Sequence, residues 1–295
     1  MIVCENLVKI YKTKDLEVLA LQGLDLNIAT GELMAIIGNS GSGKSTFLNM
    51  VGGLDRPSAG RLYVDGKDLF KMNEQELVMY KKKTVGFVWQ NNARNLLPYL
   101  NATQNVMLPM MFGNERQKKQ RAMELLELVG MAHKKNNKLS QLSGGEQQRI
   151  AIAIALANNP KVLLADEPTG SVDVKTGSYI LDVFRELNRS LGLTIVIVTH
   201  DRALSKKVNR VVAIRDGKTS SEMIVKQSYI DRLDSINMFD EAHDEFAVLD
   251  KAGRVQLPKE MLERMGLQGN KVQLELNDGK IVITAPQNEE VPKAQ

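Results

Sequence analysis

The stretch Gly38-Asn39-Ser40-Gly41-Ser42-Gly43-Lys44-Ser45, followed by Thr46, matches the pattern G-x-x-x-x-G-K-[ST]. An apolar run over 33–37 precedes it, and spacing compatible with a helix follows over 44–51. The glycines let backbone N–H groups curl around a polyphosphate, and the start of a helix adds its positive dipole end. In such a loop Lys44 reaches the β- and γ-phosphates and the Ser45 hydroxyl reaches Mg²⁺. We therefore expect a phosphate-binding loop between a strand and a helix.

Two adjacent carboxylates, Asp166 and Glu167, follow a second apolar run at 162–165. A strand this apolar is typical of the centre of a parallel sheet, whose carboxyl edge binds ligands. Asp166 can hold the metal through water there, and Glu167 can orient or deprotonate the attacking water. Because Pro168 comes next, the same pair could instead form a turn or cap a helix.

Strand and helix patterns alternate along most of the chain, which predicts an α/β fold with a largely parallel sheet. The pattern turns helical and polar between about 73 and 138, and we place an inserted helical subdomain at about 91–157. Strands are predicted at 2–11, 24–28, 33–37, 85–89, 162–165 and 194–199, and helices at 44–51, from 143 onward and at 176–191.

Composition narrows the class of protein further. The 295 residues are 43% hydrophobic and 25% charged, as in ordinary folded proteins, and 39 basic against 35 acidic residues leave only +4, which does not argue for nucleic acid. Apolar runs are too short to span a bilayer, for which about 20 residues are needed. The start of the chain lacks a secretory pattern, and the single cysteine, Cys4, cannot form an internal disulfide. We therefore expect a cytoplasmic location.

The stretch Leu142-Ser143-Gly144-Gly145-Glu146, twenty residues before the carboxylate strand, resembles the signature motif of ATP-binding-cassette (ABC) ATPases. The resemblance implies a P-loop NTPase fold, with ATP and Mg²⁺ as ligands. Physically, Ser143, Gly144 and Gly145 open a helix whose first N–H groups make a second anion site. In this family that site closes over the γ-phosphate held by a second subunit, which implies a homodimer of ATPase domains.

Other positions extend the resemblance over about 1–225. Gln90 is similar to the family's Q-loop glutamine, which senses Mg²⁺ and the transmembrane partner. Ser171-Val172-Asp173 is similar to the D-loop. His200 is similar to the switch histidine on the γ-phosphate, and Tyr11 stands where the family places a ring stacked on adenine. The resemblance thus implies Glu167, His200 and Gln90 in catalysis, with Ser45, Gln90 and Asp166 at the metal.

Four further stretches resemble the family branch that contains lipoprotein-release and macrolide-export ATPases. In that branch the cassette drives a permease that transmits force to a substrate outside the membrane. The chain departs from the branch at Trp89, Ile154 and Val172, and by about two additional residues after Gln90. The stretches are 52–57, 86–90, 95–98 and 166–170.

A separate small module is expected at 246–286, after a linker at 226–245. Its pattern predicts two strands, then a helix with Pro258 in its first turn that ends at Gly266, and then a hairpin that turns at Asp278-Gly279. It resembles the AbrB/SpoVT-type swapped-hairpin domain, and so small a unit is expected to pair with a second copy. Its charged residues nearly balance, which favours dimerisation over the DNA binding of AbrB-type regulators. They are Lys251, Arg254, Lys259, Arg264, Lys271 and Lys280 against Asp250, Glu260, Glu263, Glu275 and Asp278.

Together these features predict an ATP-binding and hydrolysing subunit of an ABC transporter. It would act as a dimer beneath a separate transmembrane permease at the cytoplasmic face of the membrane, without nucleic acid. Two alternatives stay open: an ABC ATPase of DNA maintenance or translation, and an ABC-type regulatory ATPase whose tail binds DNA. The first class usually carries long coiled-coil inserts or two cassettes in one chain, and this sequence shows neither.

Overall fold

The computed structural model describes residues 1–13, 16–90, 95–112, 114–170, 172–201, 207–225, 243–249, 253–257, 259–266 and 272–284. The chain divides into two compact units, Met1–Phe246 and Ala247–Gln295. Several expected features lie outside the described residues: Ser171, the linker over 226–242, Asp250, Lys251, Pro258 and Lys271.

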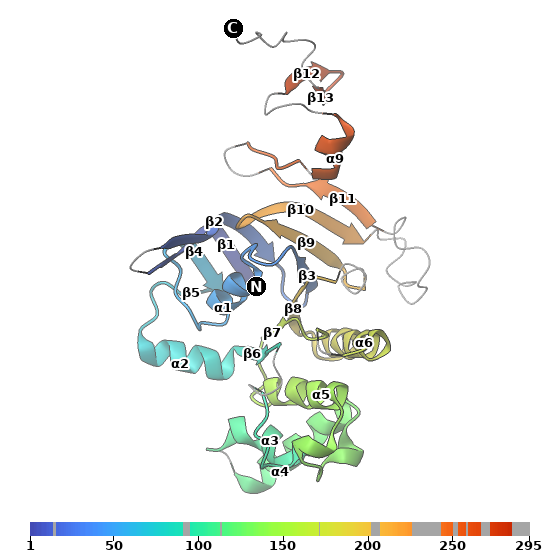
Figure 1. The fold of residues 1–295 in the computed structure, drawn as a ribbon. Helices are drawn as coiled ribbons and strands as arrows, with labels where there is room; N and C mark the ends of the chain where they lie inside the picture. Colours follow the sequence, from blue (N-terminus) through green and yellow to red (C-terminus); the bar gives the residue numbers. More distant parts are fainter. Residues whose placement is uncertain are drawn as a thin grey trace. The chain divides into compact units, whose positions relative to one another are not determined.

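A seven-stranded sheet forms the centre of the first unit, counted over the described residues, in the order β11-β10-β9-β3-β8-β7-β6 (Figure 1). The neighbours from β6 to β9 run parallel, whereas β10 pairs antiparallel with β9. The expected alternation of strands and helices is confirmed. The strands are β3 (Leu33–Ile37), β6 (Val85–Val88), β7 (Val162–Asp166), β8 (Thr194–Thr199), β9 (Arg210–Arg215), β10 (Lys218–Val225) and β11 (His243–Ala247).

The central strands are buried on both faces, and alternate residues belong to two separate cores. In β3, Ala35 and Ile37 pack on the helices α5 (Gly144–Ala155) and α6 (Val174–Leu191). Met34 and Ile36 point the other way, into a core with α1 (Lys44–Val51). This explains why the strands read as continuous apolar runs rather than as alternating ones.

The remaining helices of this unit lie on different sides. The helices α3 (Ala102–Met107) and α4 (Glu115–Leu128) join α5 in the first core, below the sheet in Figure 1. The helix α2 (Glu74–Lys83) contributes the buried Tyr80 to the second core instead. Among the described residues, no helix combines the length and the apolar character that crossing a membrane requires.

A four-stranded antiparallel sheet covers α1, in the order β2-β1-β4-β5. It contains β1 (Ile2–Lys12), β2 (Glu17–Ile28), β4 (Ala59–Val64) and β5 (Lys67–Asp68). The strand expected at 24–28 begins earlier, at Glu17. Register shifts interrupt its pairing with β1, and Gly23 has a φ of +89°, so one long strand looks like a short one in the sequence.

The described part of the second unit contains α9 (Lys259–Arg264) and the antiparallel pair β12 (Gln273–Asn277) and β13 (Lys280–Thr284). An antiparallel bridge joins Leu249 to Val255. The expected positive φ values are present: +63° at Gly266, +49° at Asp278 and +75° at Gly279. The helix and the hairpin occur in the expected order. The strand expected to open the module at 246 differs, because β11 begins at His243, within the expected linker, ends at Ala247 and pairs with β10.

Candidate functional site

The loop 38–43 leaves the carboxyl end of β3 and passes directly into α1. Gly43 precedes the helix with a φ of +102°, and a Cβ there would lie 2.6 Å from both the Ala20 carbonyl oxygen and the Leu21 Cδ2. From the other side, the Gly217 N–H donates to the Ser42 carbonyl oxygen at 3.1 Å. The loop is therefore held by β2 and by the turn between β9 and β10, and only glycine fits at position 43.

Lys44 turns back over this loop. Its Nζ donates to the carbonyl oxygens of Gly38, at 2.8 Å, and Asn39, at 2.9 Å. Burial lowers the pKa of the Lys44 ammonium below its ordinary value, although the carboxylates of Glu167 and Asp166 act in the opposite direction. The buried Ser42 hydroxyl has no hydrogen-bond partner in the described part of the chain. An anion in this loop would satisfy both groups.

Ser45 and Asp166 come together from α1 and β7, and the Ser45 hydroxyl donates to Asp166 Oδ1 at 3.1 Å. Burial raises the pKa of Asp166, and the nearby Glu167 carboxylate adds to this effect, while Ser45 and Lys44 oppose it. A cation beside Asp166 would stabilise its charged form. A hydroxyl and a carboxylate next to a phosphate loop are the oxygen donors that Mg²⁺ prefers, so these residues fit a magnesium ion.

Glu167 lies one residue further and faces His200 at the end of β8. The Glu167 Oε2 lies 2.8 Å from His200 Nδ1, and it also accepts from the His200 backbone N–H at 3.4 Å. Gln90 follows β6, and a Cβ added to Gly170 would lie 3.8 Å from its Nε2 and 3.6 Å from the Glu167 Cβ. Three strand ends thus bring Gln90, Glu167 and His200 to one edge of the sheet.

Ser143, Gly145 and Asp173 belong to a second cluster, where α5 and α6 begin side by side. Ser143 caps α5: its hydroxyl accepts from the Glu146 N–H at 3.3 Å, and Glu146 accepts from the Ser143 N–H at 2.8 Å. Asp173 caps α6 by accepting from the Thr176 N–H at 3.0 Å. A Cβ on Gly145 would lie 2.2 Å from Thr176 Cγ2, so the two helix starts are in contact.

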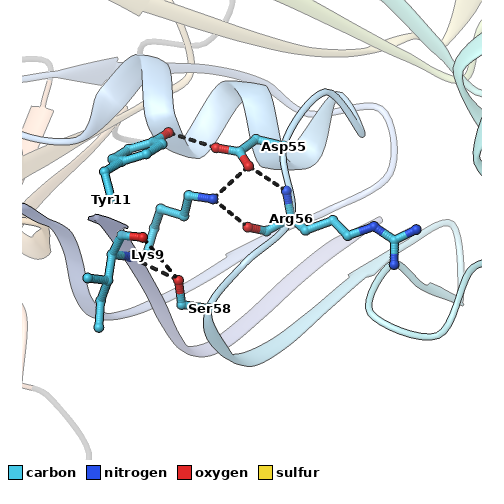
Figure 2. A network of polar contacts seen from close by, with 6 residues as sticks. Lys9, Tyr11, Asp55, Arg56 and Ser58 are labelled. Carbon is cyan, nitrogen blue, oxygen red and sulfur yellow. Dashed lines mark hydrogen bonds and ion pairs between the residues drawn. The ribbon is translucent and has the colours of Figure 1, made fainter. Parts of the chain in front are cut away.

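Tyr11 lies on β1, and its side chain is close to Thr46 of α1. Its hydroxyl also donates to Asp55 Oδ2 at 2.8 Å, and Lys9 Nζ lies 4.7 Å from the centre of its ring (Figure 2). Sequence analysis missed Lys9 and Asp55. A signal existed for Lys9, which lies two residues from Tyr11 and therefore shares its strand face. Asp55 lies within the quoted stretch 52–57, but its distance of 44 residues from Tyr11 hid the contact.

The structure thus forms one cluster from the loop 38–45, Asp166, Glu167, His200 and Gln90, with Tyr11 and Thr46 beside it, and a second from Ser143–Gly145 and Asp173. The fold and the first cluster define a P-loop NTPase with the features of an ATPase.

Comparisons with known proteins agree with this class. A family model described as ABC transporter matches residues 21–170. An uncharacterized ABC transporter ATP-binding protein of Thermotoga maritima is 46% identical over 212 residues, which are 71% of this chain and 89% of the relative. The lipoprotein-releasing system ATP-binding protein LolD of Coxiella burnetii is 43% identical over 222 residues, covering 74% of this chain and 94% of LolD.

Two further relatives extend the comparison. The macrolide export ATP-binding/permease protein MacB of Rhodopirellula baltica is 42% identical over 236 residues, which are 79% of this chain but only 34% of MacB. Among solved structures, the post-hydrolysis dimer of the cassette MJ0796 from Methanocaldococcus jannaschii, bound to ADP and Pi, has a TM-score of 0.69. It is 40% identical and covers 75% of this chain and 97% of the cassette.

The chain therefore belongs to the ABC transporter family. It is an ATP-binding subunit of an ABC transporter and an ATPase, with ATP and Mg²⁺ as its ligands.

Proposed function

We propose that this chain works as a pair of cassettes that close around two ATP molecules and drive a separate transmembrane permease at the cytoplasmic face of the membrane. One observation carries the proposal: Lys44, Asp166 and Glu167 meet at one edge of the sheet, while Ser143–Gly145 form a second cluster on other elements. Each half of an ATP site in such a pair comes from a different subunit.

Within one cassette, we assign the phosphates to the backbone of 38–46 and to Lys44. Ser45 and Asp166 would hold Mg²⁺, with Gln90 beside them, and the bound ion would neutralise phosphate charge. Glu167 orients the attacking water or accepts its proton. His200, held by its contact with Glu167 Oε2, would meet the γ-phosphate. Tyr11 would stack on the adenine base.

Across the pair, the start of α5 would complete the site of the partner subunit. Ser143, Gly144 and Gly145 offer a helix N-terminus to the γ-phosphate, which supplies positive charge where negative charge accumulates. Asp173 caps the adjoining α6 and contributes to the same surface. The dimeric post-hydrolysis state of the similar cassette MJ0796 supports this arrangement.

The relatives also support a transporter in which the cassette drives a permease that transmits force to its substrate. The similar protein LolD is named for lipoprotein release, and MacB for macrolide export. We infer that this chain drives a permease of the same branch, in which ATP-driven closure acts on a substrate outside the membrane.

For the C-terminal module we propose pairing with a second copy, as in AbrB-like swapped hairpins. Three apolar side chains of its hairpin are strongly exposed within one chain: Leu274 is 64%, Leu276 75% and Ile281 72% exposed. An isolated two-stranded hairpin is marginally stable in water, so burial of these side chains against another copy would stabilise it. The comparisons give no support to the alternative in which the tail binds DNA.

Mixed dimers test the shared site. A Lys44→Ala chain and a Ser143→Arg chain are each expected to be inactive as homodimers. Together they leave one of the two sites of a mixed dimer intact, so ATPase activity should return on mixing. Dimers that form between differently tagged chains but show no activity would contradict shared sites. The control is a mixture of two differently tagged Lys44→Ala chains, which should stay inactive.

A further inference from the structure

Lys9, Tyr11 and Asp55 form a compact polar cluster beside α1 (Figure 2). Lys9 Nζ donates to Asp55 Oδ1 at 2.6 Å and to the Arg56 carbonyl oxygen at 2.8 Å. The other carboxylate oxygen of Asp55 accepts from the Tyr11 hydroxyl at 2.8 Å. The backbone N–H of Arg56 also donates to Asp55 Oδ1, at 2.7 Å, and so helps to hold the carboxylate in place. Asp55 thus holds Lys9 and Tyr11 with different oxygens.

The Tyr11 ring is constrained in two independent ways. Lys9 Nζ lies over one face of the ring, 4.7 Å from its centre, which is within the range of a cation–π interaction. The hydroxyl at the edge of the ring donates to Asp55 Oδ2. Tyr11 as a whole nevertheless stays 39% exposed. A planar group could therefore still reach the ring from solvent.

Protonation states favour this arrangement. Burial alone raises the pKa of Asp55, but the hydrogen bonds from Lys9, Tyr11 and the Arg56 N–H outweigh it and the pKa lies below its ordinary value. Burial and the bond to Asp55 raise the pKa of Tyr11. At neutral pH a neutral hydroxyl therefore donates to a charged carboxylate, which is the stronger kind of hydrogen bond. With its side chain only 11% exposed, Lys9 loses little of this interaction to solvent.

We propose that Lys9 and Asp55 are positioning residues that fix the Tyr11 ring before nucleotide arrives, so that one ring face is held ready for the adenine base. The proposal rests on the function proposed above for Tyr11 and adds two residues to it. A ring already fixed in its binding position loses less freedom when the base stacks, and this increases affinity.

The test measures the contribution of the base to binding separately from that of the phosphates. Calorimetry on the full chain would measure the dissociation constants of MgADP and of magnesium pyrophosphate, which shares the phosphates but has no base. Tyr11→Phe, Asp55→Ala and Lys9→Met should each weaken MgADP binding about three- to tenfold, the effect of one lost hydrogen bond. Pyrophosphate binding should change less than about twofold, because the phosphate loop is untouched.

A matched control is available in Lys161, whose Nζ also lies 2.6 Å from a carboxylate, that of Asp65. Lys161→Met removes an ion pair of the same length elsewhere, although a more exposed one, and should leave both dissociation constants unchanged. A double variant adds a further check. If Asp55 acts through the Tyr11 hydroxyl, Tyr11→Phe in the Asp55→Ala background should add little to the loss.

Two failures can be told apart. If Tyr11→Ala weakens MgADP binding selectively while Asp55→Ala and Lys9→Met do not, the base site stands and the positioning role is wrong. If Tyr11→Ala leaves the ratio of the MgADP and pyrophosphate dissociation constants unchanged, Tyr11 does not bind the adenine base. The positioning role of Lys9 and Asp55 is then wrong as well. A loss of both ligands in Asp55→Ala, with the thermal midpoint lowered, would show a merely structural role and would also overturn the proposal.

Discussion

Glu167 adopts a φ of +47°, which is uncommon for any residue with a side chain. Its N–H donates to the Val198 carbonyl oxygen at 2.9 Å, so the chain stays attached to β8 at the point where it turns. This turn directs the carboxylate of Glu167 toward His200, while Asp166 faces Ser45. The two adjacent carboxylates therefore face different partners. Backbone strain of this kind is typical of functional sites.

Replacing this carboxylate should separate binding from hydrolysis. Glu167→Gln should retain ATP binding but reduce turnover by at least about 10²-fold, because the amide cannot accept the proton of the attacking water. Lys44→Ala should instead weaken binding itself, since a positive charge on the phosphates is lost. Nucleotide titration and phosphate release measure the two effects. The exposed Glu17→Gln serves as the control, and normal hydrolysis by Glu167→Gln would refute the assignment.

Between elements, the contact of α5 with α6 depends on Gly145. A Cβ at this position would lie 2.2 Å from Thr176 Cγ2, so Gly145→Ala should destabilise the chain by about 1–3 kcal/mol. Thr176→Ser removes the interfering methyl group and keeps the hydroxyl that donates to Asp173. Urea unfolding should therefore show the double variant restored toward the wild type. A double variant no more stable than Gly145→Ala alone would show that the contact is not the cause.

The start of α5 also predicts a pH dependence. The Ser143 N–H, and secondarily its hydroxyl and Lys134, lower the pKa of Glu146 in the folded chain. The charged form therefore stabilises the fold above its unfolded pKa of about 4.3, and this stability is lost as the pH falls through the lower folded value. Glu146→Gln should be less stable than the wild type by about 0.3–1 kcal/mol at pH 7. Urea unfolding at decreasing pH should show the difference shrinking below pH of about 4.3, and a constant difference would contradict the charge effect.

These elements show what a sequence can and cannot predict. β3, α1 and the cap at Ser143 follow from local patterns: an apolar run, a glycine loop and a serine three residues before Glu146. The sequence analysis missed the full length of β2, whose pattern register shifts and Gly23 interrupt, and it did not predict β9, which pairs with the distant β3, or β10. The same holds for the site. The motif residues were predictable, whereas the contact of Asp55 with Tyr11 is made only by folding.

At the scale of the whole molecule, the two units differ in how they bury apolar side chains. The first unit encloses two cores on either side of its sheet. In the second, every residue of β12 is exposed, including Leu274 and Leu276. The first unit therefore has the means to fold alone, whereas the second is expected to need a further surface.

Removal of the chain from residue 248 onward, which keeps β11 (His243–Ala247) in the first sheet, tests this difference. The truncated protein should still fold and bind ATP, but its nucleotide-free self-association should weaken. A paired tail would hold two cassettes at an effective concentration in the millimolar range, and truncation abolishes this tether. Sedimentation of both proteins without nucleotide measures the change. Gly279→Val in the full chain should reproduce the effect, because a φ of +75° resists a branched side chain, whereas the neighbouring Lys280→Gln should not. Equal dimer dissociation constants for full-length and truncated protein would exclude the tether, and retention of DNA by the full chain but not the truncated one would favour the regulatory alternative.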